Sequence, residues 1–355
     1  MFKLIPRRST DVRYFLDDPA RELEGVRSGG PGRFLIGEGD PTHRDDVSGV
    51  LRGTSKSEVV GYDLVIAAPR PISVLLATEP DDVAITLVRA HQDAVQRALS
   101  YLQERAIVVR ERHQGRDVEV SAPLDAAVGF THGVNRAGEP HLHDHVLIGS
   151  TSRTVGRAFD RRVVTAHLPT ADALYVADIR HAMTSHGTPM WRTFDGRIRV
   201  AGVDEGVLGL WPGVGGLRGE KRDWTRAALR EKWSSQLADV IPIRSYEPPE
   251  MKRWVNEHSL GAEIELRHSI SRRHLLAAWA NGAAFGVPID TLNSLMATYY
   301  PTLEHDFGLG EYQVARSDAI PWRLIREYGP RPLDLADARL WVHRVRERDE
   351  RSRSR

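Results

Sequence analysis

Residues 130–150 read FTHGVNRAGEPHLHDHVLIGS and carry four histidines ahead of an apolar run. Because side chains alternate between the two faces of a β-strand, His141, His143 and His145 would share one face. Two imidazoles from this strand, together with a third imidazole, can bind a single metal ion. Coordination positions on that ion then stay open for water and substrate oxygens. Spacing alone leaves the third ligand open between His141 and His132. Scattered surface histidines are the alternative interpretation, but so dense a cluster favours a metal site.

The segments before the histidines predict a long helix followed by strands. Residues 81–106 repeat apolar side chains at helical spacing and begin with two acids, which is typical of an amphipathic helix. Three strand-like runs follow, IVVRER, VEVSA and AAVGFTH, and the histidine stretch supplies a fourth. We therefore expect the histidine strand to pair antiparallel to the strand that ends at His132.

The sequence after the histidines predicts a further helix, a hairpin and a change of composition. Residues 168–187 are helical in pattern and close with a glycine, and residues 191–202 contain the turn pair Asp-Gly. The expected fold class is therefore α+β, an antiparallel sheet with helices, over residues 1–238. Helical patterns replace strand patterns in residues 239–355, where we expect a smaller, mainly helical region of unknown role.

Composition limits the residue types that can bind a metal or act as a nucleophile, and it bears on the cellular location. The chain has 355 residues and no cysteine, so a metal ion must be held by His, Asp or Glu, and cysteine nucleophiles are excluded. The net charge of +1 neither favours nor excludes nucleic acid, because a basic groove can be offset by acidic surface elsewhere. No apolar run is long enough for a signal peptide or a membrane span, so we expect a cytoplasmic protein.

Three separated blocks resemble the relaxase domain of MobF-type conjugative relaxases, which are HUH endonucleases. They are GYDLVIAAPRPISVLLA (61–77), AHQDAVQRALSYLQ (90–103) and the histidine block (130–150), in the order and spacing of that family. The resemblance covers roughly residues 1–235 and implies a palm-like antiparallel sheet with helices. It also implies metal-dependent nicking and rejoining of one DNA strand at an origin of transfer, with a 5′-phosphotyrosine intermediate, in conjugation or plasmid mobilisation.

The resemblance assigns roles to individual residues. His143 and His145 match the paired metal ligands of the family, and His132 matches its third ligand. Tyr14 matches the nucleophile, and Asp63 matches the acidic residue near the metal and the tyrosine. Asp63 is a candidate both for the base that takes the tyrosine proton and for the group that orients a ligand imidazole; the sequence leaves these two roles open.

Cofactor and partners follow from the same resemblance. Three imidazoles are softer ligands than Mg²⁺ prefers, so we expect Mn²⁺ and other transition ions to bind more tightly, while cellular abundance favours Mg²⁺. Arg13, Arg70 and Arg136 are candidate phosphate contacts to single-stranded DNA at an origin of transfer. The sequence lacks the glycine-rich Gly-Lys-Ser/Thr motif of nucleotide hydrolases, so we expect a separate helicase beside accessory relaxosome proteins.

Two departures from the family pattern keep alternatives open. Tyr14 is the sole tyrosine before Tyr62, where many relatives carry two or two pairs, and Pro71 replaces a common serine. These departures suit a DNA-binding protein with a decayed nickase centre, but the intact histidines and Asp63 argue against decay. How a second strand transfer would occur with one tyrosine stays open. A rolling-circle replication initiator would use the same chemistry, and a small-molecule metalloenzyme is disfavoured by the three matching blocks.

Overall fold

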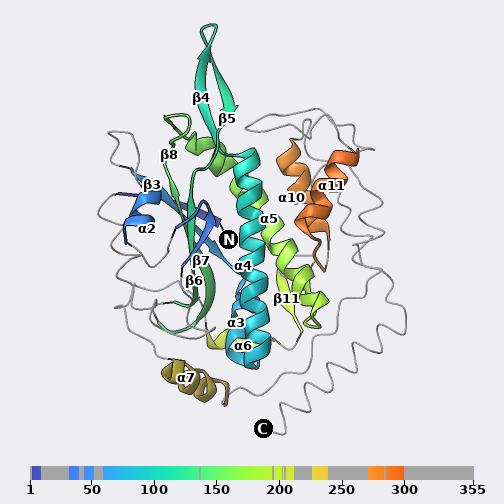
Figure 1. Cartoon of the computed structure of the whole chain (residues 1–355). Coiled ribbons are helices and arrows are strands. Elements are labelled where there is room, and N and C mark those ends of the chain that lie inside the picture. Colours follow the sequence, from blue (N-terminus) through green and yellow to red (C-terminus); the bar gives the residue numbers. More distant parts are fainter. Residues whose placement is uncertain are drawn as a thin grey trace.

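The computed structural model places the histidine stretch in the centre of one antiparallel sheet (Figure 1). It describes residues 2–8, 32–39, 44–51, 59–135, 137–193, 196–201, 203, 205–211, 226–238, 271–283 and 285–299. The sheet has five strands in the order β1-β3-β7-β6-β2, all paired antiparallel. In this order, the bounds are Phe2–Arg7, Gly61–Ala67, Pro140–Gly149, Ala127–Val134 and Arg33–Ile36. The expected pairing of the histidine strand, β7, with the strand through His132 is confirmed.

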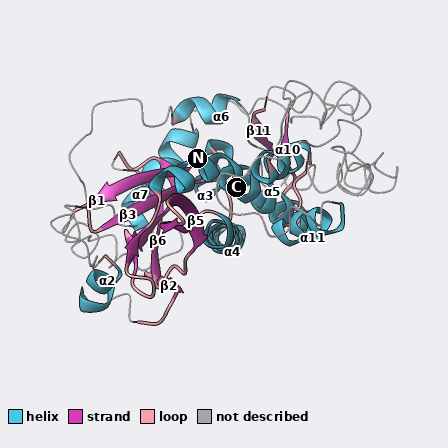
Figure 2. Ribbon diagram, turned by 90° about the horizontal axis from the view of Figure 1, so that it is seen from above, coloured by secondary structure: helices cyan, strands magenta, loops and turns pink. Residues whose placement is uncertain are grey.

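Two long helices, α4 (Asp81–Arg105) and α5 (Arg161–Ser185), cover one face of the sheet, which we call the helix face (Figure 2). The expected amphipathic helix is α4, whose apolar side chains at helical spacing, among them Leu99 and Leu102, are buried in the main core. Strand β7 contributes Leu142 and its other alternate apolar side chains to the same core. An α+β fold with an antiparallel sheet is thereby confirmed.

The opposite face carries the histidines, and we call it the histidine face. A smaller apolar cluster lies there under the short helix α2 (Arg44–Val50). In it, Val47 and Leu51 pack with Phe130 and Leu147 from the two central strands. The histidine face is therefore anchored by apolar packing at one end of the sheet, beside the cluster of imidazoles.

Helix α5 begins earlier than the sequence pattern predicts. The expected helix begins at Leu168, whereas α5 begins at Arg161 and runs through Pro169. The predicted start was wrong because Pro169 resembles an N-terminal helix signal, whereas α5 continues through Pro169 despite the lost backbone donor and the crowding of its ring against the preceding turn. The observed start is capped by Asp160, whose carboxylate accepts a hydrogen bond from the Arg162 amide at 3.0 Å.

The remaining described elements surround this core. Strands β4 and β5 form a hairpin that projects beyond the rest of the described fold (Figure 1). The predicted hairpin at residues 191–202 is confirmed as β10 and β11, with Gly196 at a positive φ of 81°. The bounds are β4 Val108–His113, β5 Arg116–Ser121, β8 Thr151–Ser152, β9 Arg157–Ala158, β10 Met190–Arg192, β11 Ile198–Val200, α3 Arg70–Thr78, α6 Glu205–Leu210 and α7 Arg226–Ala238.

Two helices beyond residue 238, α10 (Arg272–Gly282) and α11 (Ile289–Tyr299), pack against α5. Trp279 of α10 is fully buried and belongs to the main core. The boundary near residue 238 stays a prediction, and the helical pattern expected at residues 334–350 lies outside the described residues. No helix among the described residues is long and apolar enough to cross a membrane.

We expect the contact between the α10–α11 connection and α5 to tolerate no side chain at Gly286. A Cβ there would lie 2.0 Å from the Ala177 carbonyl oxygen, and Gly286 has a φ of 85°. Gly286→Ala should lower the free energy of unfolding by about 3 kcal/mol, measured by urea denaturation. Gly115→Ala is the control, because Gly115 has a φ of 80° and open space around it. It should cost only about 1 kcal/mol, and equal losses would contradict the close packing.

Candidate metal centre

Three imidazoles converge on the histidine face of the sheet. One ligand nitrogen from each of His132, His143 and His145 lies within 4.8 Å of the other two. The ring centroids are 5.2 Å apart for His132 and His143, 5.3 Å for His132 and His145, and 5.2 Å for His143 and His145. Three imidazole nitrogens this close can hold one divalent ion between them, with the remaining positions free for other ligands.

Strand register creates this arrangement. His132 on β6 lies directly opposite His143 on β7, and directly opposite residues of an antiparallel pair project from the same face. His145 stands two residues further along β7 and so shares that face. The pairing becomes irregular just beyond His132, which is common beside functional sites.

His141 contacts His143 but lies outside the converging set. Its ring packs on that of His143, with centroids 4.5 Å apart and planes inclined by 33°. Its backbone carbonyl accepts a hydrogen bond of 2.8 Å from His143 Nδ1. That bond places the proton of His143 on Nδ1 and leaves the lone pair of Nε2 for a metal ion.

Burial keeps the imidazoles of His143 and His141 neutral. Burial and repulsion from His141, His132 and His145 hold the pKa of His143 well below its usual range. Burial also lowers the pKa of His141 to about 4. Since a metal ion binds the neutral form of imidazole, the environment of His143 suits a ligand at neutral pH.

Asp63 lies beside the cluster and holds one of its members. His145 Nδ1 is 2.9 Å and 3.0 Å from the two Asp63 carboxylate oxygens, and the Asp63 side chain is fully buried. The guanidinium of Arg7, on the edge strand β1, donates to the same carboxylate. A carboxylate on the outer nitrogen of a ligand histidine fixes its tautomer and ring orientation. Sequence reasoning found Asp63 but missed Arg7, which carries no local signal.

A second buried carboxylate belongs to Asp144, which lies between His143 and His145 in the sequence. Its side chain projects from the helix face. Asp144 accepts from His91 Nε2 at 3.0 Å and from the Arg33 guanidinium at 2.7 Å. Burial opposes the ionisation of Asp144, but attraction to His91 and Arg33 outweighs it and lowers the Asp144 pKa. The other nitrogen of His91 lies 2.6 Å from the Tyr175 hydroxyl. Sequence reasoning missed this network because its members are far apart along the chain.

The other predicted site residues are placed as follows. Tyr14, Arg13 and Arg136 lie outside the described residues. Arg70 begins helix α3, and its guanidinium donates to the Leu208 carbonyl of α6. In the described structure, Arg70 therefore links two helices, and its expected role as a phosphate contact stays a prediction.

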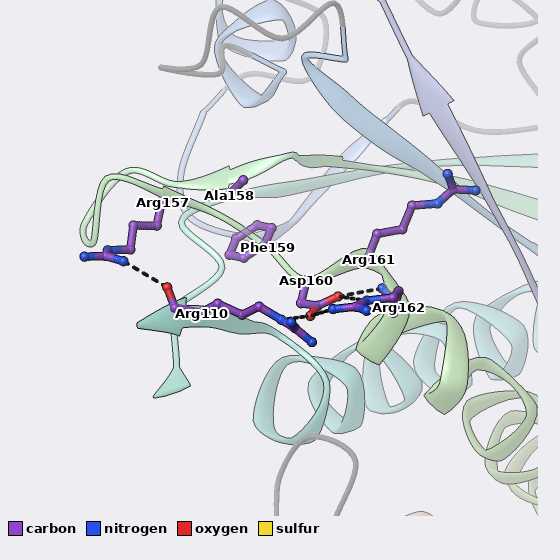
Figure 3. A pocket seen from close by; sticks show the side chains of 7 residues that line it. All are labelled: Arg110, Arg157, Ala158, Phe159, Asp160, Arg161 and Arg162. Carbon is purple, nitrogen blue, oxygen red and sulfur yellow. Dashed lines mark hydrogen bonds and ion pairs between the residues drawn. The ribbon is translucent and has the colours of Figure 1, made fainter. Parts of the chain in front are cut away.

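A separate concave site of about 390 Å³ lies where β4, β9 and the start of α5 meet (Figure 3). Four arginines and one aspartate line it, and the Asp160 carboxylate accepts from Arg110 and Arg162. The Arg161 side chain extends away from this ion-paired group (Figure 3). The pocket is basic and has no histidine in its lining, so it suits an anion and differs in kind from the imidazole cluster.

Comparison with known proteins decides the family. The TrwC relaxase family profile matches residues 19–211, more than half of the chain. The chain belongs to the TrwC relaxase family. As a relaxase it is a DNA nickase and transesterase, and both the resemblance and the enzyme class predicted from the sequence are confirmed. No curated protein matches the sequence.

Solved relaxase structures share this fold. The TrwC relaxase in complex with oriT DNA, in its metal-bound structure, is 19% identical, with a TM-score of 0.53 over 67% of this chain and 98% of that one. TrwC with a 27-mer DNA comprising the recognition hairpin and the cleavage site is 20% identical, with a TM-score of 0.51 and the same coverage, 67% and 98%. The palm-like relaxase fold expected from the sequence is confirmed.

The relaxase should lose metal affinity when an imidazole of the converging set is removed. We expect His132→Ala to weaken Mn²⁺ binding by at least about 100-fold, measured by titration calorimetry, since it deletes one of three ligands. His141→Ala is the matched control, because it removes a neighbouring ring and keeps the carbonyl that holds His143. Its Mn²⁺ affinity should change by less than about 10-fold. A larger loss in His141→Ala than in His132→Ala would show that the third ligand is His141.

Proposed function

We propose that this relaxase nicks single-stranded DNA at an origin of transfer by attack of Tyr14 on the scissile phosphate. The Tyr14 oxygen forms a bond to phosphorus, the bond to the 3′ oxygen breaks, and the 5′ end stays attached as a phosphotyrosine. Reversal by a 3′ hydroxyl rejoins strands without a nucleotide, because the ester bond is conserved. The convergence of His132, His143 and His145 within a TrwC relaxase fold is the observation that carries this proposal.

The donor set fits a divalent ion. Three imidazole nitrogens lie together, and the Asp63 carboxylate orients His145 through its Nδ1. An ion there would withdraw electron density from the scissile phosphate and offset the charge that develops on its oxygens. We expect Mn²⁺ to bind more tightly than Mg²⁺ because imidazole is a softer ligand than Mg²⁺ prefers, with other transition ions competing.

Asp63 orients a ligand, in this proposal, and does not act as the base. Its two oxygens already accept from His145 and from Arg7, and its side chain has no exposed surface. A carboxylate so engaged is poorly placed to accept a further proton from an incoming tyrosine. Tyrosine has an ordinary pKa of about 10, so the hydroxyl would lose its proton only as its oxygen attacks phosphorus, while the departing 3′ oxygen takes up a proton and becomes the 3′ hydroxyl.

The proposed partner is single-stranded DNA at an origin of transfer, and the TrwC complexes named above contain oriT DNA or a 27-mer with the recognition hairpin and the cleavage site. Accessory relaxosome proteins and a separate helicase complete the proposed assembly. We further propose that the arginine pocket at the start of α5 contacts DNA phosphates. Its four arginines outnumber its one acid, and arginine binds phosphate through paired donors.

Substitution of the proposed nucleophile tests the reaction directly. Tyr14→Phe should abolish covalent protein–DNA adducts and leave oligonucleotide affinity unchanged, because only the attacking oxygen is lost. The assay incubates protein and Mn²⁺ with single-stranded oligonucleotides tiled across the origin region of its own element, followed by a denaturing gel. Tyr62→Phe is the control, since Tyr62 is the next tyrosine in the sequence and should form adducts normally. Adducts that persist in Tyr14→Phe would assign the nucleophile to another residue.

Salt dependence tests the arginine pocket. Arg161→Gln should weaken the binding of every oligonucleotide alike. The slope of the logarithm of the binding constant against the logarithm of the salt concentration should fall in magnitude by about 0.7, the value for one lost phosphate contact on a single strand. Fluorescence anisotropy across a range of salt concentrations measures that slope. Arg89→Gln, at an exposed position on α4, is the control and should keep the slope. An unchanged slope in Arg161→Gln would remove this pocket from the DNA contact surface.

A further inference from the structure

A lysine on the edge strand β1 lies on the same face of the sheet as the candidate metal ligands. Lys3 is directly opposite Val65 of β3, and Val65 is directly opposite His145 of β7. Directly opposite residues of antiparallel strands project from the same face. Lys3, Val65 and His145 therefore form one row across the histidine face, with the lysine at the β1 edge of the sheet.

Val65 is the residue that separates the lysine from the ligand. Two strand spacings place the backbones of Lys3 and His145 about 10 Å apart. Val65 is half-buried, and Lys3 is exposed. A lysine stem packs along apolar surface while its ammonium stays in water. The four-carbon stem of Lys3 can therefore cross Val65 and bring its charge towards the imidazole cluster.

The charge of Lys3 acts on the imidazoles of this face. Burial is the largest cause that lowers the pKa of His141 to about 4, and repulsion from Lys3 is one of the smaller causes. The ring of His141 packs on that of His143, with centroids 4.5 Å apart. A lysine whose charge reaches His141 extends over the histidine face rather than away from the sheet.

The other basic residue of β1 is already engaged in an ion pair. Arg7 donates to the buried carboxylate of Asp63, so these two charges offset each other. The three candidate ligands are neutral in the form that binds a metal ion. Of the two basic residues in β1, Lys3 is therefore the one that can meet an anionic substrate on the histidine face.

We propose that the Lys3 ammonium contacts a non-bridging oxygen of the scissile phosphate when that phosphate lies at the candidate metal centre. This inference rests on the proposed function. As the Tyr14 oxygen bonds to phosphorus and the 3′ oxygen departs, negative charge spreads over the non-bridging oxygens. A positive charge at the β1 edge stabilises that arrangement more than the bound substrate, so it accelerates the reaction.

Single-turnover adduct formation at saturating Mn²⁺ and oligonucleotide tests the rate contribution in the full chain. Lys3→Met keeps an unbranched stem and removes the charge, so it should slow adduct formation on the order of 10-fold. Lys3→Arg should recover most of the rate, because it restores the positive charge. Arg89→Met is the matched control: it removes an exposed charge from α4, on the other side of the sheet, and should react at the wild-type rate.

A neutral phosphate analogue identifies the group that Lys3 contacts. On an unmodified oligonucleotide, Lys3→Met should bind about 3-fold more weakly than wild type, measured by fluorescence anisotropy. On an oligonucleotide with a methylphosphonate at the scissile position, the two proteins should bind equally, because the charge that Lys3 meets is gone. A methylphosphonate several nucleotides away should leave the 3-fold difference in place.

Three results would overturn the contact. They are equal adduct rates for Lys3→Met and wild type, a loss of rate that more Mn²⁺ recovers, and a binding difference that persists on the scissile methylphosphonate. Lysine on an edge strand also discourages pairing with another chain, and that role alone predicts equal rates. If wild-type protein forms no Tyr14 adduct, the proposed nucleophile fails. A scan of single methylphosphonates across the bound oligonucleotide then still decides whether one phosphate accounts for the Lys3 difference.

Discussion

The register between β6 and β7 is the constraint on which the candidate site depends. With His132 opposite His143, the third imidazole projects from the same face as the β7 pair. A shift of one residue would send it to the helix face, among apolar side chains. The register is specified by the apolar residues that alternate with the histidines, because Leu142 and Val146 must enter the main core. Core packing therefore decides where the candidate metal ligands lie.

Strand β7 serves two functions by using both faces. Its histidine face presents the ligands, and its helix face buries Asp144 in contact with His91 and Arg33. A buried charge in the centre of a sheet is costly unless it is fully partnered, and Asp144 has partners from α4 and from the edge strand. The same partners join the sheet to the helix layer at the level of the ligands. The polar contacts of Asp144 on the helix face therefore support the candidate centre on the other face of the strand.

The sequence predicted the histidine strand, its pairing and the α+β class because periodicity and turn residues report local structure. It could not choose between His132 and His141 as third ligand from spacing, since that choice depends on which residue of a neighbouring strand lies opposite. The start of α5 was missed because Pro169 mimics a helix start while the real cap, Asp160, lies nine residues earlier. Arg7, Arg33 and His91 could not be found, because contacts across 56, 111 and 53 residues leave no local pattern.

The proposed reaction places different demands on the metal centre and on the nucleophile. A rigid sheet can hold three imidazoles in fixed geometry, but a covalent DNA adduct must form, persist and reverse, which requires the tyrosine to move relative to the phosphate. A second strand transfer with one tyrosine would need the attached 5′ end to leave before another attack.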